Sequence, residues 1–540
     1  MRLRFFRWHR FAVVLAFVGV TVTAATADAQ LRDSTQIFPL VPGGAITKSF
    51  VQEIGSGRGD TSSAGSSLFI IKRDPFRAVR RGRQIFQRKF QFAQGLGPLT
   101  DDGIGNVALI GGDPSRAAGL ADSCAGCHGR PRGAAGFGGD VVTRPDSRDA
   151  PHLFGLGLHE MIADEMTGSL RAIRAAAGNE AVETETDVTS TLRAKGVNFG
   201  SITAHGDGTF DTSGVVGVDA DLRVRPFFAQ GGTISIREFL VGAFNAEMGL
   251  ESADPDLIRA AAGDVVQTPA GMLLNGVTDR IERSPVGSPT TDGDFDEVPD
   301  EIPTSIVDFM EFYLLNYFKP ALGEQTPDAV AGRAVFTQIG CPSCHVANMV
   351  VTQDRRVADL DTVFNAAQGN PFNRLFATAT PLTINGLAGV DDGSGLPTLK
   401  IPAQRSFVVR NFFADLKRHD LGPNFHERNY EGTFTERFMT EPLWGVGTTA
   451  PYGHDGRSPS LEDVILRHGG EATVQRDAFA GLSRASKNMV LSFLGSLVLF
   501  PPDDTASNLQ PINPAAPRFP QNGHGAIALT VIFNDPTDVE

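Results

Sequence analysis

Cysteine and tryptophan are scarce in this chain: its 540 residues include only four cysteines and two tryptophans. An exported protein would normally be expected to use cysteine for disulfides, and four offer few of them. Positive charge is also in deficit. The formal net charge of −14 argues against nucleic-acid binding and suits basic, soluble partners. A chain of this length is too long to fold around one ordinary hydrophobic core, so two or three domains are expected.

Long apolar runs are missing except near the N-terminus, where four arginines precede the run Phe11–Val20. Residues 27–29 read Ala-Asp-Ala, the small-x-small pattern of a signal-peptidase site. The run is short for a membrane span, so a cleaved secretory signal at 1–29 is predicted, with a periplasmic or otherwise exported product and no membrane span after cleavage. Because these residues carry a net charge of +3, their removal leaves a charge of −17.

All four cysteines lie in two CxxCH motifs, "CAGCH" at 124–128 and "CPSCH" at 341–345. Two thiols three residues apart can form thioethers with one haem, and the following histidine can bind its iron. A redox pair would not need histidine in both copies, and zinc would need the two pairs brought together. The pattern therefore predicts two covalently bound haem c groups. Their residues are Cys124, Cys127 and His128 for haem 1, and Cys341, Cys344 and His345 for haem 2.

The repeat extends beyond the cysteines and indicates an internal duplication. Each half carries a similar motif before its cysteines, a Gly-rich motif after them, then a proline-aromatic loop leading into a helix. The matched pairs are GRQIF (82–86) with GRAVF (332–336), PHLFGLG (151–157) with PLWGVG (442–447), and 225–244 with 450–469; apolar helices follow at 305–318, where Ser305 and Asp308 suggest a capping box, and at 488–500.

His468 follows a second predicted capping box, formed by Ser460 and Asp463, and precedes the helix-stopping Gly469-Gly470. It is thus expected on the last turn of a helix, near the negative end of the dipole. From spacing alone, an axial ligand for haem 2 and an ordinary helix C-cap both stay open. The matched position in the first half is Ala243, so haem 1 lacks that ligand.

The stretch "TAPYGHDGRSPSLEDVILRHGG", with both CxxCH units and PLWGVG, resembles the bacterial di-haem cytochrome c peroxidase superfamily over roughly residues 76–500. The chain is most similar to its di-haem oxidoreductases labelled thiol oxidoreductase-like. In the peroxidases, the residue in the place of His468 is a methionine ligand of the electron-transferring haem. The resemblance therefore implies a bis-histidine, low-spin haem 2, and His454 is expected to shape the loop between haems.

The predicted fold is mainly α, with two cytochrome c-like haem domains and a small β-rich insertion at about 160–224 in the first, where alternation and turn residues suggest a hairpin. The predicted segments are a signal peptide (1–29), an N-terminal extension (30–75), haem domain 1 (76–318), haem domain 2 (319–500) and a Pro-rich tail (501–540).

The resemblance also concerns the open face of haem 1. The peroxidases close the resting site with a histidine that the segment 136–151 lacks; His152 or His159 could substitute, or could simply be packing residues. The pattern Glu247-Met248-Gly249 implies a glutamate that moves a proton between the oxygens of peroxide; a solvated glutamate at a helix end is the alternative. A departure concerns the interhaem tryptophan of the peroxidases, because this chain offers Phe227 and Phe228 in that loop.

Two lesser signals remain. The acidic stretch 290–303 spaces its aspartates like a calcium loop but has Glu297 where that loop needs glycine and Pro303 at its last position, so a calcium site and a solvated acidic linker both stay open. The candidate calcium ligands are Asp292, Asp294, Asp296 and Asp300.

His419 is expected to bond a haem propionate or the backbone.

The sequence thus predicts a periplasmic di-haem c oxidoreductase, with electron transfer and peroxidase-like chemistry at an open haem 1. Two alternatives are a di-haem electron carrier without a substrate and an oxygen-using di-haem dioxygenase. The expected partners are a small redox protein as electron donor or acceptor, and peroxide or a small or protein-borne substrate.

Overall fold

A computed structural model describes residues 148–293, 297–317, 320–356, 406–429 and 432–499, with pieces of the N-terminal region (58–59, 65–73, 75–90, 95, 121–129, 135 and 140–141). The predicted signal peptide and the Pro-rich tail lie outside the described residues. Within them, no helix has both the length and the apolar character needed to cross a membrane.

The first half, up to residue 317, is built around a helical core. Gly82 of the GRQIF motif lets α3 approach α8 closely, because a Cβ at this glycine would lie 2.3 Å from the carbonyl oxygen of Phe309. Helix α6 completes this core against α8. The helices are α2 (Ser67–Arg73), α3 (Pro75–Gln87), α4 (Cys124–His128), α5 (Leu156–Thr184), α6 (Ile236–Met248), α7 (Pro255–Ala261) and α8 (Thr304–Leu315).

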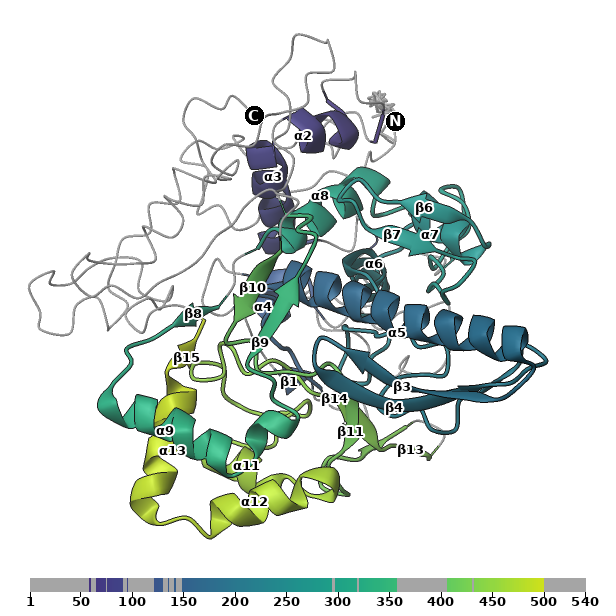
Figure 1. Cartoon of the computed structure of the whole chain (residues 1–540). Helices are drawn as coiled ribbons and strands as arrows, with labels where there is room; N and C mark the ends of the chain where they lie inside the picture. The colour runs from purple at the N-terminus through teal and green to yellow at the C-terminus, as the bar shows by residue number, and fades with distance from the viewer. Residues whose placement is uncertain are drawn as a thin grey trace, which may run out of the picture.

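The second half repeats this close helix pairing with α9 and α13. Gly332 of the GRAVF motif faces α13, and a Cβ there would lie 1.8 Å from the carbonyl oxygen of Met489. Figure 1 shows α9 and α13 side by side, with α11 and α12 beside them. The elements are α9 (Pro327–Gln338), α11 (Leu461–Arg467), α12 (Thr473–Ala480), α13 (Arg484–Gly495) and the 3-10 turns η3 (Cys341–Ser343) and η5 (Gly470–Ala472).

Short antiparallel strand pairs accompany the helices, so the described chain is mixed rather than mainly α. The pairs are β1 (Asp140–Val141) with β2 (Arg148–Asp149), β6 (Val265–Gln267) with β7 (Leu273–Asn275), β8 (Ala321–Leu322) with β15 (Leu497–Val498), β9 (Asn348–Val351) with β10 (Phe407–Arg410), β11 (Arg418–Asp420) with β14 (Arg437–Met439), and β12 (Glu427–Arg428) with β13 (Phe434–Thr435). The pairing of β8 with β15 joins the two ends of the second half.

The predicted β-rich stretch is partly wrong, because the chain is helical as far as Thr184. Its alanine-rich sequence favours the long helix α5. A three-stranded antiparallel sheet follows, β3 (Val188–Ala194), β4 (Val197–Ala204) and β5 (Phe210–Asp211), and α5 lies along it (Figure 1). We refer to residues 188–225 as the β3–β5 segment.

A second apolar core joins the two halves. It contains side chains of α5 and of the β3–β5 segment, together with Phe412, Ala414, Leu416 and Trp444 of the second half. The β3–β5 segment therefore packs against residues that lie far beyond it in the sequence.

The matched segments 225–244 and 450–469 share their local backbone. Each makes one isolated antiparallel bridge, Phe227 with Thr233 and Tyr452 with Ser458, at positions that correspond one to one. Each helix that follows is capped by the matched serine, Ser235 for α6 and Ser460 for α11, as their side chains accept backbone N–H bonds. By contrast, the capping box predicted at Ser305 is wrong: α8 has Pro303 as its N-cap and Ser305 lies inside the helix.

Candidate haem sites

The first CxxCH motif is the whole of helix α4. The Ser123 hydroxyl caps this helix by accepting a hydrogen bond from the Gly126 N–H at 3.0 Å. The Nδ1 atom of His128 lies 2.7 Å from the carbonyl oxygen of Pro151. Because a carbonyl only accepts, Nδ1 donates this hydrogen bond, as it does in imidazoles that bind a metal through Nε2.

The second motif holds its histidine in the same way. Its cysteines stand on and directly after η3, and the Nδ1 atom of His345 donates to the carbonyl oxygen of Phe413 at 3.0 Å. Burial, with a smaller contribution from the nearby His468, lowers the pKa of His345 to about 4 against the raising effect of the Phe413 carbonyl. The imidazole is therefore neutral at pH 7, which is the form that binds a metal.

His468 directly follows Arg467, the last residue of α11, and is the C-cap of that helix rather than a member of its last turn. Its Nδ1 atom donates to the carbonyl oxygen of Val464 at 2.6 Å, and its ring meets Phe425 edge to face. Burial lowers the pKa of His468. His468 thus offers Nε2 in the neutral form, and it lies near enough to His345 to affect the pKa of that residue.

None of the four thiols forms a disulfide, and all four are partly buried. Burial raises the pKa of Cys124 and of Cys341 to about 12 in each case. A redox-active CxxC pair instead needs a thiolate stabilised at neutral pH. The surroundings of both motifs therefore argue against a thiol redox role.

The residues fit a c-type haem at each motif. Each motif supplies two thiols and one imidazole whose Nδ1 is held by a main-chain carbonyl. Such a hydrogen bond fixes the ring and makes its Nε2 a stronger iron ligand. Bound haem would supply one-electron chemistry, and reaction with small oxidants where a coordination position is open.

His152 and His159 were the sequence-based substitutes for a sixth ligand at haem 1. The Nε2 atom of His152 lies 2.9 Å from the carbonyl oxygen of Trp444, and its Nδ1 accepts the Phe154 N–H at 3.3 Å. Both nitrogens of His152 are thus in use. His159 stacks on Trp444 at a centroid distance of 5.3 Å, and its buried Nε2 makes no hydrogen bond. Burial lowers the pKa of His152 to about 4 and that of His159 to about 3.

Glu247 lies on the last turn of α6 and is partly buried. Its carbonyl oxygen accepts the N–H of Ala121 at 3.0 Å, shortly before Cys124. The structure therefore brings the main chain of Glu247 next to the first CxxCH motif.

The candidate calcium ligands are only partly described, since Asp294 and Asp296 lie outside the described residues. Asp292 accepts the Glu297 N–H at 3.0 Å, and the Asp300 carboxylate lies 3.4 Å from the Ala253 N–H. Burial raises the pKa of Asp300.

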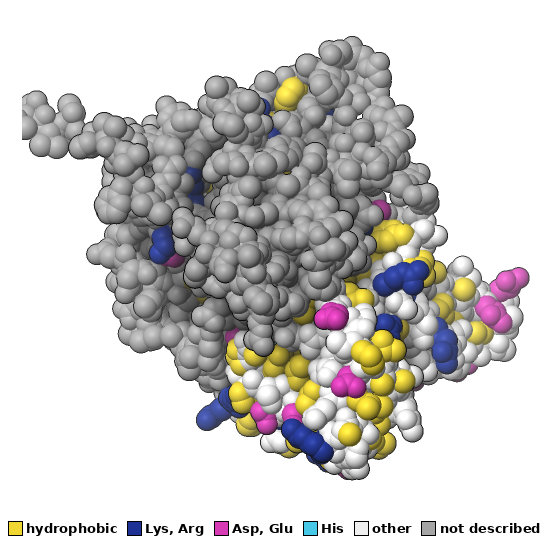
Figure 2. All heavy atoms as spheres, turned by 90° about the vertical axis from the view of Figure 1, so that its left-hand side faces the viewer, with side chains coloured by type: hydrophobic (Ala, Val, Ile, Leu, Met, Phe, Trp, Pro, Cys, Tyr) yellow, Lys and Arg dark blue, Asp and Glu magenta, His cyan; other side chains and the backbone are white. Residues whose placement is uncertain are grey.

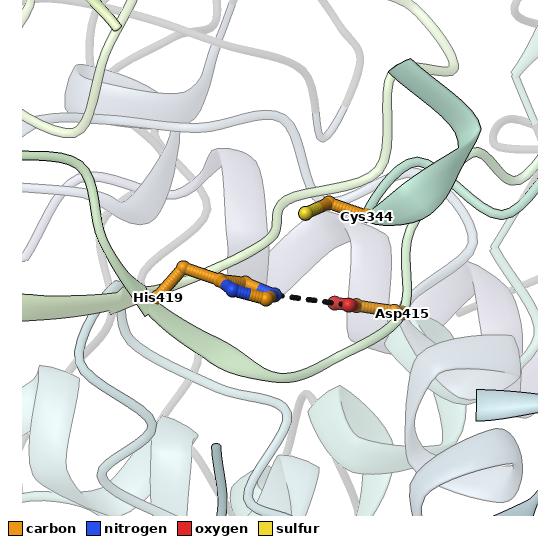
Figure 3. A group of neighbouring side chains, drawn as sticks. All are labelled: Cys344, Asp415 and His419. Carbon is orange, nitrogen blue, oxygen red and sulfur yellow. Dashed lines mark hydrogen bonds and ion pairs between the residues drawn. The ribbon is translucent and has the colours of Figure 1, made fainter. Parts of the chain in front are cut away.

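A cluster of acid, imidazole and thiol lies beside the second motif (Figure 3). The Nε2 atom of His419 lies 2.9 Å from an Asp415 carboxylate oxygen. The Nδ1 atom of His419 lies 2.7 Å from a carboxylate oxygen of Glu471. Burial alone would lower the pKa of His419, but hydrogen bonds to Asp415 and Cys344 raise it to about 10. Both nitrogens of His419 thus bond carboxylates of the protein and not the backbone, and a bond to a haem propionate stays a prediction.

The ligand atoms of Cys344, Asp415 and His419 lie within 4.8 Å of one another, a grouping that could also hold a metal ion. Figure 3 shows the Cys344 thiol beside the facing His419 and Asp415 side chains. A thioether to haem would remove this thiol as a metal ligand, so the two assignments exclude each other. The presence of His345 next to Cys344 favours haem.

Sequence reasoning missed the main-chain partners of the histidines and the position of Trp444. The Trp444 ring packs edge to face on Phe412 at 5.0 Å, and its carbonyl bonds His152. Trp444 thus lies between the segment around Pro151, whose carbonyl holds His128, and the loop around Phe413, whose carbonyl holds His345. Its occurrence in PLWGVG, directly matched to PHLFGLG, was the only signal that pointed to this position.

A comparison with known families matches a segment that follows the second motif. Residues 389–497, which include His454 and His468, match the family described as "Di-haem oxidoreductase, putative peroxidase". The matched region begins among residues outside those described. A search of curated proteins found no match.

Two solved structures show weak similarity to this chain. One is the hydrazine synthase of Kuenenia stuttgartiensis, 13% identical with a TM-score of 0.21; the alignment covers 36% of this chain and only about half, 55%, of that one. The other is a MauG-like protein associated with microbial copper homeostasis, 14% identical with a TM-score of 0.22, covering 54% of this chain and 72% of that one. The family match confirms the predicted resemblance over residues 389–497, which are similar to the di-haem oxidoreductases.

Proposed function

We propose that this chain is an exported di-haem c oxidoreductase, with peroxidase-like chemistry at haem 1 and electron transfer at haem 2. The observation that carries the proposal is the shared geometry of three histidines. His128, His345 and His468 each direct Nδ1 to a main-chain carbonyl, the hydrogen bond that orients an imidazole for metal binding through Nε2.

The difference between the two sites supports different roles. Haem 2 has two candidate axial ligands, His345 and His468, and six-coordinate haem of this kind is suited to carrying electrons. Haem 1 has His128, whereas His152 uses both of its nitrogens elsewhere and His159 stacks on the Trp444 ring. An open position is what a reaction with peroxide requires.

Glu247 is the proposed proton-handling group at haem 1. Its main chain contacts the segment before Cys124, and its side chain is only partly exposed. A carboxylate there can accept a proton from one peroxide oxygen and give it to the other.

The proposed partners are a small redox protein at haem 2 and peroxide, or a small or protein-borne substrate, at haem 1. Figure 2 shows scattered acidic and basic side chains among apolar ones on the described part of one face. The overall negative charge favours a basic redox partner. Calcium at the acidic stretch around Asp292 and Asp300 is part of the same proposal.

Electron paramagnetic resonance of the ferric protein, with and without cyanide, tests this assignment. We expect one high-spin signal that cyanide converts and one low-spin bis-histidine signal that cyanide leaves unchanged. Two low-spin signals that both ignore cyanide would contradict an open haem 1 in the oxidised protein and favour the electron carrier without a substrate.

A further inference from the structure

The loop that holds His345 has an uncommon backbone. Asn411, Phe413 and Leu416 all have positive φ angles, of 58°, 54° and 56°, although none is glycine. Residues with a side chain seldom adopt this left-handed conformation and keep it only where the surroundings impose it. We call residues 411–417 the Phe413 loop.

This conformation aims two groups at the second CxxCH motif. The Phe413 carbonyl accepts the proton of His345 Nδ1, and the Asp415 carboxylate bonds His419 beside Cys344. The second half holds the loop through two hydrogen bonds to the residues that follow His345: Phe412 N–H to the Ala347 carbonyl at 2.9 Å, and Ala414 N–H to the Val346 carbonyl at 3.2 Å.

The β3–β5 segment of the first half holds the other end of the loop. The Arg418 N–H donates to the Gly217 carbonyl at 2.9 Å, and the Arg418 guanidinium bonds the Asp219 carboxylate. Asp219 also pairs with Arg225 at 2.8 Å, so one carboxylate ties two arginines from the two halves together. A cavity of about 10 Å³ beside these residues has room for about one water.

The contact between the two parts is close. Gly217 has a φ of 76°, and a Cβ there would lie 2.6 Å from Cε of Lys417. The Lys417 ammonium lies over the Phe199 ring at 5.9 Å, and Phe199 shares a buried core with Phe412 and Leu416. Polar and apolar contacts of the β3–β5 segment therefore act on the same short loop.

We propose that Asp219 and Arg418 are positioning residues for haem 2: through them the β3–β5 segment keeps the Phe413 loop in the conformation that fixes His345. The inference rests on the proposed function, which assigns haem 2 to His345. A hydrogen bond from Nδ1 to a carbonyl makes the imidazole a stronger donor and favours ferric iron. Weakening this bond should raise the reduction potential of haem 2.

The test compares Asp219→Ala with Arg418→Gln in the full di-haem protein, by potentiometric titration of each haem. If the residues acted only through their charges, loss of the negative group would raise the potential of haem 2 and loss of the positive group would lower it. If they act by positioning, both variants raise it. Asp219→Glu, which keeps the carboxylate, should restore the original value.

Asp207→Ala is the matched control, because Asp207 is a carboxylate of the same segment that bonds Thr209 instead of the Phe413 loop. It should leave the potential of haem 2 unchanged, and none of the variants should change that of haem 1. Opposite shifts for Asp219→Ala and Arg418→Gln, or no shift in either, would overturn the inference. If the unmodified protein lacked a low-spin bis-histidine haem, the proposed function would fail first, and this outcome is separate from the variant results.

Discussion

The segments 225–244 and 450–469 have the same bridge and the same serine cap, yet differ in chemistry. His468 ends the helix in one segment, while the matched Ala243 lies within the longer helix α6 in the other. The bridge and the serine cap are thus common to both segments, which differ in the side chain at the matched position and in where the helix ends. Five changes test or extend this comparison.

The largest effect is expected from removing one pair of thiols. Replacing Cys124 and Cys127 by alanine should remove covalent haem from the first half only, because thioether attachment needs these thiols. Mass spectrometry of the denatured protein should show one haem fewer, and the matched Cys341/Cys344 double variant should lose the other. Retention of two covalent haems in either variant would show that the motifs do not attach haem.

Glu247→Gln tests whether the first half is the reacting one. The amide keeps the size of the side chain but cannot take up a proton, so we expect peroxide consumption to fall by roughly 10²–10⁴-fold. The low-spin signal of haem 2 should be unchanged. Glu238→Gln on the same helix is the control, since Glu238 bonds Ser235 and the helix N-terminus. Equal rates in the Glu247 variant and the parent would remove Glu247 from the reaction.

His468→Ala should make the second half resemble the first. Without the second imidazole, haem 2 is expected to change from low-spin to high-spin and to bind cyanide. The optical and paramagnetic spectra report both changes. His454→Ala is a useful control because His454 stacks on Phe438 of β14, at a centroid distance of 3.8 Å, and should leave haem 2 low-spin. A low-spin haem 2 in the His468 variant would mean that another residue is the ligand.

The residues that the sequence predicts well are those with local signals. Ser460 and the two glycines after His468 indicate the start and stop of α11, and the CxxCH motifs identify their own histidines. The carbonyls of Pro151 and Phe413 could not be predicted, because any residue has a carbonyl and only the folded loop directs it. The Phe413 loop, with its left-handed angles, contacts residues some 200 positions earlier, and periodicity cannot show such a contact.

A smaller effect concerns His419, which lies beside the second motif. The folded protein raises its pKa from 6.5 to about 10, so the imidazolium stabilises the fold fully below pH 6.5, and this contribution is lost as the pH rises through 10. When Cys344 forms a thioether with haem, its contribution to the raised pKa of His419 is lost, and that pKa then lies below 10. Loss of charge-assisted bonds should cost roughly 1.5–3 kcal/mol.

The measurement is the free energy of unfolding by denaturant between pH 6 and pH 10.5, for the parent and for His419→Gln. The variant should show a flatter dependence on pH over this range, because it has no imidazolium to lose. The partly exposed His205 is paired with Asp187, and His205→Gln serves as the control for a surface histidine. The same slope in the His419 variant and the parent would contradict a charged His419.

The smallest change is expected from Ala243→His, which places the missing histidine at the matched position of the first half. His468 is a C-cap whose backbone angles of −55° and 133° turn its side chain out of the helical path. Residue 243 is followed by more than one further turn of α6, so its side chain must keep the direction of a helical residue. We therefore expect haem 1 to keep its high-spin, cyanide-sensitive signal. A new low-spin signal in this variant would show that side-chain identity alone, and not the end of the helix, distinguishes the two sites.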